Sequence, residues 1–481
     1  MKLNLTKKMQ PMKKTKIIAT ISNKACSVPL LREMYNAGMN VVRLNTAHQS
    51  LEDAVPVIEN IRAVSDRIGI MIDTKGPEIR TLDISEPMPV KTGDRLLVKG
   101  ACEDPEQGQC VYVSYDRFTD DLSVNDRILI DDGSVELQVQ EKCDGELTCI
   151  VKNDGVIMGK KSINVPAVNI RHLPSLSAKD KDFIAFAAEQ NVDFIAHSFV
   201  RRKEDVLAVQ EILDRKNSPI KIIAKIENRD GIDNIDEILD HSYGAMIARG
   251  DLAIEIPAEK IPLIQKKLVR TCINRRKPVI IATQMLQSMV SSPRPTRAEV
   301  SDVANACLDG TDAVMLSGET ANGKYPLESV RMMTKIAAEV ESGSSTFIDT
   351  EYDIQNTVTS YLAKSAVKAS IRLHTKALVA DSISGRTILS LAAYRGENPI
   401  YAQCYEKRVM RELALSYGVH ANYMVPDLTT HMFLQSALTR LLEEQKIAEK
   451  DLITVLAGNF GSDYGASYVE ISTVENLLKR R

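Results

Sequence analysis

A cation and a carboxylate stand together at the end of an apolar run, IIAKIENRDG at residues 222–231. Lys225 and Glu227 are two residues apart, so alternation along a strand directs both side chains to the same face. A second carboxylate, Asp251, follows the next apolar run, GAMIARGDL. Two carboxylates beside a cation form an incomplete oxygen cage, which Mg²⁺ accepts while it keeps positions open for water and substrate oxygens.

Other polar residues end further apolar runs in the same way. They are Arg43 and Asn45, then Asp73, Thr74 and Lys75, and later Arg249 and Thr283. One such residue alone is more simply explained as a cap or a rim ion pair, but several that converge would form a site. Asp73 and Asn45 could hold a second hard cation. Arg43, Arg80 and Lys225 would then face an anion, an arrangement suited to phosphoryl transfer.

Two glycine-containing segments bear on phosphate binding. Gly250 and Asp251 open a turn whose backbone N–H groups could bind a carboxylate or a phosphate. Residues 318–325, GETANGKY, match the first seven positions of a P-loop. Tyr325 then stands where a Ser or Thr hydroxyl should reach the metal, so we reject a P-loop here.

Composition excludes several classes of protein. The chain has 481 residues, a net charge of −3 and 5% aromatic residues, so it has neither the charge nor the stacking platform of a nucleic-acid binder. The basic N-terminus lacks the apolar core of a signal peptide, and no segment has the apolar length of a membrane span. The eight cysteines form no C-x-x-C pair and are expected to be reduced thiols. We therefore expect a cytoplasmic protein.

Apolar runs alternate with amphipathic helical patterns along most of the chain. Strands are expected within residues 15–21, 40–45, 69–75, 192–200, 220–228, 244–252, 278–285 and 312–318, each associated with a helical pattern. Eight such units predict a parallel sheet closed into a (β/α)₈ barrel. Active sites of these barrels lie at the carboxyl ends of the strands, where the polar residues above are found.

Two further domains interrupt or follow the barrel. Short strand-like pieces with D-G and G-x turns fill residues 76–171, which we expect to form a small β-barrel lid over the active face. Residues 344–481 contain five more strands alternating with helices and are expected to form a regulatory α/β domain. The catalytic barrel would then consist of residues 1–75 and 172–343.

Several stretches closely resemble the sequences of pyruvate kinases. They are GMNVVRLNTAH, DTKGPEIR, KIENRDGI, ARGDLAIEIP and the long run from ATQMLQSM to GETANGKYP. The inserted and C-terminal domains also stand where that family carries its lid and its regulatory domain. The resemblance implies transfer of a phosphoryl group from phosphoenolpyruvate to ADP, with Mg²⁺ and K⁺ as cofactors, and it suggests a homotetramer.

The resemblance also implies roles for individual residues. Lys225 matches the lysine that stabilises the transferring phosphoryl group and the developing enolate, while Glu227 and Asp251 match the Mg²⁺ ligands. Gly250 and Asp251 match the turn that binds the substrate. Thr283 matches the threonine that helps deliver a proton to the enolate.

A second set of roles concerns the phosphate, the monovalent ion and the nucleotide. Arg43 should bind the substrate phosphate. Asn45, Asp73 and the Thr74 carbonyl should bind K⁺. The residues expected near the nucleotide are Asn45, His48, Arg80 and, on the lid, Lys161.

This chain departs from the family pattern at two loops. Ser22 and Asn23 replace a glycine and a proline on the nucleotide side, which leaves the preferred diphosphate open. Ala47 replaces a serine whose hydroxyl ligates K⁺ in the family, and Thr46 points to the opposite face. Glu78, however, matches the glutamate that goes with K⁺ dependence.

Two other functions stay open on the sequence alone. The first is a barrel aldolase that uses Lys225 as a Schiff base, which would need a lowered lysine pKa, whereas neighbouring carboxylates would raise it. The second is a pyruvate-kinase-like sensor whose catalysis is impaired by the altered loops, although the side chains for phosphoryl transfer are all present.

The C-terminal domain contains a candidate anion site in DSISGRT, residues 381–387. Its hydroxyl, glycine and cationic residues are Ser382, Ser384, Gly385, Arg386 and Thr387, and the N–H groups of the following helix favour an anion. An ordinary helix cap would explain the same pattern. Resemblance to the effector loop of pyruvate kinases favours a phosphorylated metabolite, with Arg386 or residues 457–465 completing the site.

Overall fold

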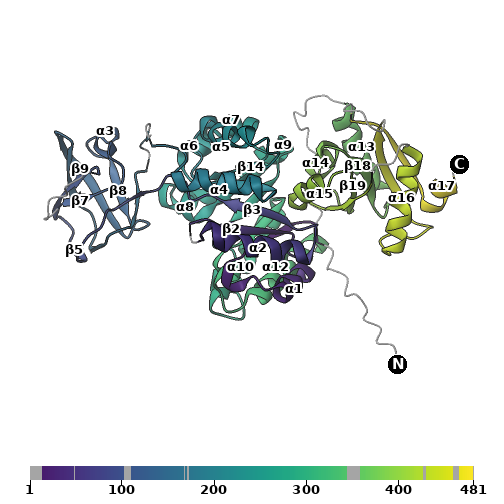
Figure 1. Ribbon diagram of the computed structural model, residues 1–481, viewed down its shortest axis with the longest axis horizontal. Coiled ribbons are helices and arrows are strands. Elements are labelled where there is room, and N and C mark those ends of the chain that lie inside the picture. Colours follow the sequence, from purple (N-terminus) through teal and green to yellow (C-terminus); the bar gives the residue numbers. More distant parts are fainter. Residues whose placement is uncertain are drawn as a thin grey trace.

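The computed structural model describes residues 13–47, 49–101, 110–166, 168, 170, 173–343, 358–425, 430–458 and 465–479. Three bodies follow one another along its long axis: a small β-domain, a central barrel and a C-terminal α/β domain (Figure 1). Among the residues described, none of the helices combines the length and the apolar character needed to cross a membrane.

The central body is a closed barrel of eight parallel strands, as predicted. They are β1 (Lys16–Thr20), β2 (Val41–Asn45), β3 (Gly69–Asp73), β13 (Phe194–His197), β14 (Lys221–Ile226), β15 (Gly244–Ala248), β16 (Val279–Ala282) and β17 (Ala313–Leu316). Alternate side chains such as Ile18, Met71, Phe194 and Met246 fill the barrel interior, and the others pack against the surrounding helices. Because all strands are parallel, their carboxyl ends meet on one rim.

Helices surround the barrel and connect successive strands. They are α1 (Val28–Ala37), α2 (Leu51–Val64), α4 (Ala178–Glu189), α5 (Lys203–Arg215), α6 (Arg229–Asp233), α7 (Ile235–His241), α8 (Arg249–Glu255), α9 (Ile261–Asn274), α10 (Arg297–Leu308), α11 (Gly318–Ala321) and α12 (Pro326–Gly343). Capping boxes at Ser50, Ser177 and Thr296 begin three of them. One boundary differs from the prediction: β15 ends at Ala248, so Asp251 lies in the first turn of a helix rather than on a strand.

The inserted domain is a curled sheet with the strand order β4-β12-β8-β9-β10-β6-β7. Its elements are β4 (Ile79–Arg80), β6 (Arg95–Lys99), β7 (Cys110–Tyr112), α3 (Phe118–Asp121), β8 (Arg127–Ile130), β9 (Val135–Cys143), β10 (Glu146–Val151) and β12 (Ser162–Asn164), with β5 (Met88–Val90) and β11 (Gly155–Ile157) paired separately. The two edge strands meet where Ser114 N donates to Arg80 O at 2.7 Å and Leu82 N donates to Tyr112 O at 2.8 Å. These bonds turn the sheet into the small barrel that the sequence predicts.

The C-terminal domain has a five-stranded sheet with helices on both faces. It contains α13 (Val358–Arg372), β18 (Leu378–Ser382), α14 (Arg386–Ala393), β19 (Ile400–Cys404), α15 (Lys407–Glu412), β20 (Val419–Tyr423), α16 (Thr430–Glu443), β21 (Leu452–Gly458), β22 (Ala466–Thr473) and α17 (Val474–Lys479). Apolar residues of α13, α14 and α15 cover one face, and those of α16 and α17 cover the other. The sheet is parallel apart from β22, which runs antiparallel to β21.

The C-terminal domain packs on the floor of the barrel, opposite the rim that carries the polar residues. Leu415 closes the lower end of the barrel core. A buried ion pair joins Arg395 Nη2 to Asp312 Oδ2 at 2.6 Å, and a partly buried pair joins Arg411 Nε to Asp193 Oδ1 at 2.6 Å. Asp312 and Asp193 immediately precede β17 and β13, so these pairs attach the domain to the strands themselves. The residue boundaries of the three domains stay predictions.

Candidate active site

Lys225 lies between two carboxylates at the rim of the barrel. Its Nζ is 3.1 Å from Asp73 Oδ1 and 3.0 Å from Glu227 Oε1. All three residues are buried, with exposed fractions of 8%, 1% and 3% respectively. The cation and carboxylate that are two residues apart in the sequence therefore contact each other, and a third charged group from β3 joins them.

The charges around Lys225 fix its protonation. Burial alone would lower the pKa of Lys225, but Asp73 and Glu227 outweigh it and hold this pKa above its ordinary value. A Schiff-base lysine needs the opposite shift. Burial raises the pKa of Glu227 to about 7, since repulsion from Asp251 adds to burial while Lys225 opposes it. The site therefore holds a permanent cation, Lys225, beside Glu227. A further cation would stabilise the ionised form of Glu227.

Arg43 is held in the same cluster through Asp73. Its Nε lies 2.5 Å from Asp73 Oδ2, and its Nη1 donates to Thr20 Oγ1 at 3.1 Å. Although burial favours the neutral acid, Arg43 and Lys225 lower the pKa of Asp73, which therefore stays ionised. One carboxylate from β3 thus orients cations from β2 and β14.

Ser198 is a member of the cluster that the sequence prediction missed. Its Oγ accepts a hydrogen bond from Lys225 Nζ at 2.6 Å and donates one to Thr74 O at 2.6 Å. The neighbouring Phe199 N donates to Glu227 Oε2 at 2.7 Å. Ser198 directly follows β13, a strand for which the sequence analysis named no site residue. Its position at the end of an apolar run is the feature that could have identified it.

Thr283 and Gly250 lie together beside this cluster. Gly250 N donates to Thr283 Oγ1 at 2.7 Å, and Arg249 Nη2 donates to Thr283 O at 2.9 Å. Thr283 has a φ of 66°, in the left-handed region that side chains seldom adopt. Arg249 also forms an ion pair with Asp302 at 2.6 Å, so this arginine braces the loop and does not face the site.

The residues predicted near K⁺ and the nucleotide do not all lie together: some are at the barrel rim and others are on the lid side. Asn45 Oδ1 accepts from Ala47 N at 3.1 Å, and Thr46 Oγ1 donates to Asp73 O at 2.9 Å. On the lid side, Arg80 pairs with Glu78 at 2.7 Å. The other two candidates are Lys161, which pairs with Asp131 on the lid at 3.1 Å, and His48, which lies outside the described residues.

The donor set fits the cations that the sequence predicts. Glu227 and Asp251 offer two carboxylates, and within the described ranges no group of three or more His, Cys, Asp or Glu side chains could hold a metal ion. A two-carboxylate site suits Mg²⁺, which retains waters and substrate oxygens. Asn45 Oδ1, Asp73 and Thr74 O are oxygen donors of the kind that K⁺ accepts.

The candidate effector loop lies at the start of α14. Gly385 has a φ of 83° and its N–H donates to Ser382 Oγ at 2.8 Å, so Ser382 closes the turn. Arg386 Nε donates to Ser384 Oγ at 3.2 Å. Thr387 follows in the first turn of α14, and residues 459–464, predicted as possible partners of this loop, lie outside the described residues.

The eight-stranded barrel, its lid and the charged cluster at the rim define a phosphotransferase of the (β/α)₈ class. The family model described as "Pyruvate kinase, barrel domain" matches residues 12–330, and "Pyruvate kinase, alpha/beta domain" matches residues 360–471. The chain therefore belongs to the pyruvate kinase family.

Individual relatives agree with this assignment. The chain is 47% identical over 476 residues to the pyruvate kinase of Borreliella burgdorferi, covering 98% of this chain and 99% of that protein. It is 42% identical over 482 residues to the pyruvate kinase of Geobacillus stearothermophilus, covering 97% of this chain and 81% of that protein. The crystal structure of a pyruvate kinase from Cryptosporidium parvum superposes with a TM-score of 0.89 at 35% identity, covering 96% of each chain.

Proposed function

We propose that this enzyme transfers the phosphoryl group of phosphoenolpyruvate to ADP, giving pyruvate and ATP, at the carboxyl ends of the barrel strands. The observation that carries the residue assignment is the buried Lys225 ammonium, held between Asp73 and Glu227. A fixed cation in a site shielded from water stabilises charge that develops during phosphoryl transfer more strongly than one in solution.

Lys225 is the proposed electrostatic catalyst. Loss of the phosphoryl group leaves the enolate of pyruvate, and the ammonium stabilises negative charge on the oxygen and on the transferring group. The hydrogen bond to Ser198 and the ion pair with Asp73 fix Nζ before the substrate arrives. This preorganisation means that little reorganisation is needed during the reaction.

Arg43 is the proposed phosphate-binding residue. Two of its nitrogens are held by Asp73 and Thr20, whereas Nη2 forms no hydrogen bond with a described residue. A guanidinium held in this way presents its remaining N–H groups to a phosphate in a fixed orientation. Arg80 and Lys161 would approach the phosphates of ADP from the lid side and Asn45 from the end of β2, and His48 is proposed to take part.

Glu227 and Asp251 are the proposed ligands of Mg²⁺. When bound, the ion supplies positive charge that polarises the transferring group and neutralises its oxygens. Asn45, Asp73 and the Thr74 carbonyl are the proposed ligands of K⁺. Since Ala47 supplies no hydroxyl, this second site has one fewer side-chain donor than the family pattern provides.

Thr283 is the proposed residue for protonation of the enolate. Its hydroxyl accepts from Gly250 N and donates to Ala282 O at 2.7 Å, so it lies in a continuous hydrogen-bond chain. The left-handed backbone at Thr283 holds the side chain there. To protonate the substrate carbon, the hydroxyl turns its proton away from Ala282 O and takes a replacement proton from solvent, since neither Gly250 N–H nor Ala282 O can supply one.

Regulation and assembly form the last part of the proposal. The loop of Ser382, Ser384, Gly385, Arg386 and Thr387 is proposed to bind a phosphorylated metabolite. The enzyme is proposed to act in the cytoplasm as a homotetramer.

The function is tested by a coupled assay of pyruvate formation with phosphoenolpyruvate, ADP and Mg²⁺, with K⁺ present or absent. Lys225→Met should abolish turnover and change phosphoenolpyruvate binding less than about tenfold, because Lys225 acts on transition-state charge. Lys221→Met, at the opposite end of the same strand, is the matched control and should retain turnover. A Lys225→Met enzyme with most of its kcat would overturn the assignment.

A further inference from the structure

His197 is a buried residue to which the proposed mechanism gives no role. It is the last residue of β13, and it is 1% exposed. Side chains alternate along a strand, and Ala196 faces the interior of the barrel, so His197 points outward from the barrel wall. The imidazole therefore lies behind the catalytic rim, where it does not touch the substrates.

A hydrogen bond joins His197 to the end of the neighbouring strand β3. His197 Nδ1 lies 3.1 Å from Thr74 Oγ1, and both residues are buried. Ser198 N donates to the same Thr74 hydroxyl at 3.1 Å, so this hydroxyl has its own proton left to give to another partner. Within the part of the chain that the structure describes, the acceptor for that proton is His197 Nδ1. The network therefore assigns the ring proton of His197 to Nε2.

The carbonyl of Thr74 faces the catalytic cluster. Thr74 O accepts from Ser198 Oγ at 2.6 Å, and Ser198 Oγ accepts from Lys225 Nζ at 2.6 Å. Ser198 is thus bonded to Thr74 twice, through its backbone N–H and through its hydroxyl. A continuous line of hydrogen bonds runs from His197 through Thr74 and Ser198 to the Lys225 ammonium.

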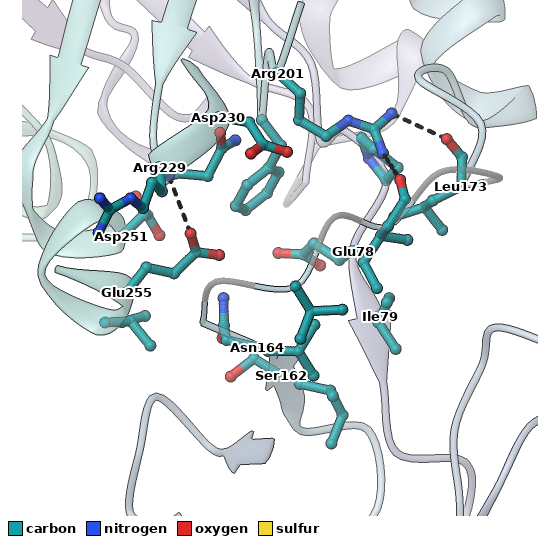
Figure 2. Close-up of a pocket in the computed structure, with 18 of the residues that line it drawn as sticks. Glu78, Ile79, Ser162, Asn164, Leu173, Arg201, Arg229, Asp230, Asp251 and Glu255 are labelled. Carbon is teal, nitrogen blue, oxygen red and sulfur yellow. Dashed lines mark hydrogen bonds between the residues drawn. The ribbon is translucent and has the colours of Figure 1, made fainter. Parts of the chain in front are cut away.

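The loop that carries Ser198 is held at its other contacts. Phe199 N donates to Glu227 Oε2 at 2.7 Å, and Arg201 donates to Leu173 O at 3.0 Å (Figure 2). With this backbone held, the freedom that remains lies in the side-chain rotations of the two hydroxyl residues. A fixed acceptor decides the direction of a hydroxyl, and the imidazole supplies that acceptor.

We propose that His197 is a positioning residue, which holds the Thr74 hydroxyl and through it keeps Ser198 in contact with the Lys225 ammonium. This inference rests on the proposed function, because it takes Lys225 to be the electrostatic catalyst. Without the acceptor, the buried Thr74 hydroxyl is left unpaired and turns to another partner, which breaks its bond with Ser198 N. The loss falls on the transition state, because a preorganised cation acts on the charge that develops there.

Two variants of nearly equal shape test the hydrogen bond. His197→Asn offers an Oδ1 acceptor close to the position of Nδ1, whereas His197→Leu has the same branching and no acceptor. His197→Leu should lower kcat about tenfold, as one unpaired buried partner predicts, and change KM for phosphoenolpyruvate less than about twofold. His197→Asn should keep kcat within about threefold of the original, because the acceptor is retained.

A second comparison separates positioning from a general effect on the fold. In Ser198→Ala the contact with Lys225 is already lost, so adding His197→Leu should lower kcat no further, whereas independent effects would multiply. A tenfold effect of His197→Leu that persists in Ser198→Ala would refute the proposal. Thr74→Val removes the same contact from its other side and replaces His197→Leu in both comparisons if that variant does not fold.

The control is His241→Ala, which removes an exposed histidine at the end of α7 and should keep the original kcat. An original enzyme that forms no pyruvate from phosphoenolpyruvate and ADP would overturn the proposed function and this inference with it. An active original enzyme in which His197→Asn and His197→Leu have equal kcat would overturn this inference alone.

Discussion

Two lysines are buried between the barrel floor and the C-terminal domain, and they make the stability of the fold increase with pH above neutrality. Lys16 and Lys13 are 2% and 5% exposed. Lys16 Nζ donates to Val419 O at 2.5 Å, and Lys13 Nζ donates to Asn40 Oδ1 at 2.7 Å. Burial lowers the pKa of Lys16 from 10.5 to about 8. Burial and repulsion from Lys16 lower the pKa of Lys13 to about 7.

The sign of the effect follows from the direction of these shifts. Below pH 8 both the folded and the unfolded chain carry the Lys16 proton, so the fold bears the full cost of a buried charge. Between pH 8 and 10.5 only the unfolded chain retains the proton, so stability rises with pH. At about 1.4 kcal/mol per pKa unit, the cost is on the order of 3 kcal/mol at pH 7 and on the order of 1 kcal/mol at pH 9.5.

Lys16→Met should remove this cost. An unfolding entropy of about 2 cal/mol/K per residue gives about 1 kcal/mol/K for a chain of this length, so 2 kcal/mol corresponds to about 2 °C. We therefore expect the Tm difference, Lys16→Met minus the original protein, to be about 2 °C more positive at pH 7 than at pH 9.5. Thermal unfolding of both proteins at the two pH values measures it. Loss of the bond to Val419 O shifts both measurements equally and does not affect this comparison.

The control is Lys216→Met, which removes an exposed lysine at the end of α5. Its Tm difference from the original protein should be the same at both pH values. If the Lys16→Met difference is also the same at pH 7 and pH 9.5, the reasoning from burial is wrong.

Three other predictions concern the cations and the effector. Glu227→Gln and Asp251→Asn should each raise the Mg²⁺ concentration for half-maximal rate at least about tenfold, because each removes a hard anionic ligand, and unchanged metal titrations would count against this site. Ala47→Ser should lower the half-saturating K⁺ concentration by restoring a hydroxyl, which equal half-saturation in both proteins would contradict. A phosphorylated metabolite should lower the half-saturating phosphoenolpyruvate concentration. Ser384→Glu should abolish that effect through charge repulsion while it spares the rate at saturating substrate. If a panel of sugar phosphates and AMP changes neither the kinetics nor the Tm of the original protein, the loop is only a helix cap.

The sequence predicted the barrel and much of its charged cluster for one physical reason. Near-continuous apolar runs that alternate with amphipathic helices can bury both faces of a strand only in a parallel, helix-covered sheet. Once the sheet is parallel and closed, residues that end separate runs must share one rim. The sequence alone therefore places Asp73, Lys225 and Glu227 on the same rim of the barrel.

Helix boundaries at the rim were less predictable. Arg249 and Asp251 directly follow the apolar run that forms β15. That run ends at Ala248, and nothing in its pattern indicates that a helix begins at the next residue. Arg249 was counted among the candidate site residues, but its guanidinium is held by Asp302 and by the Thr283 carbonyl. The partners of Arg249 come from parts of the chain that are distant in sequence, so the local sequence does not predict them.

The local sequence determines which residues can reach the rim, because apolar periodicity and strand length are properties of short segments. Tertiary structure decides which of those residues pair and how they ionise. Ser198 accepts a hydrogen bond from Lys225 only because β13 and β14 lie side by side in the folded barrel. The pKa values of Glu227 and Lys16 likewise depend on burial by segments that are far away in the sequence. Electrostatic energies depend on distance and on the surrounding medium, and both are set only when the whole chain has packed.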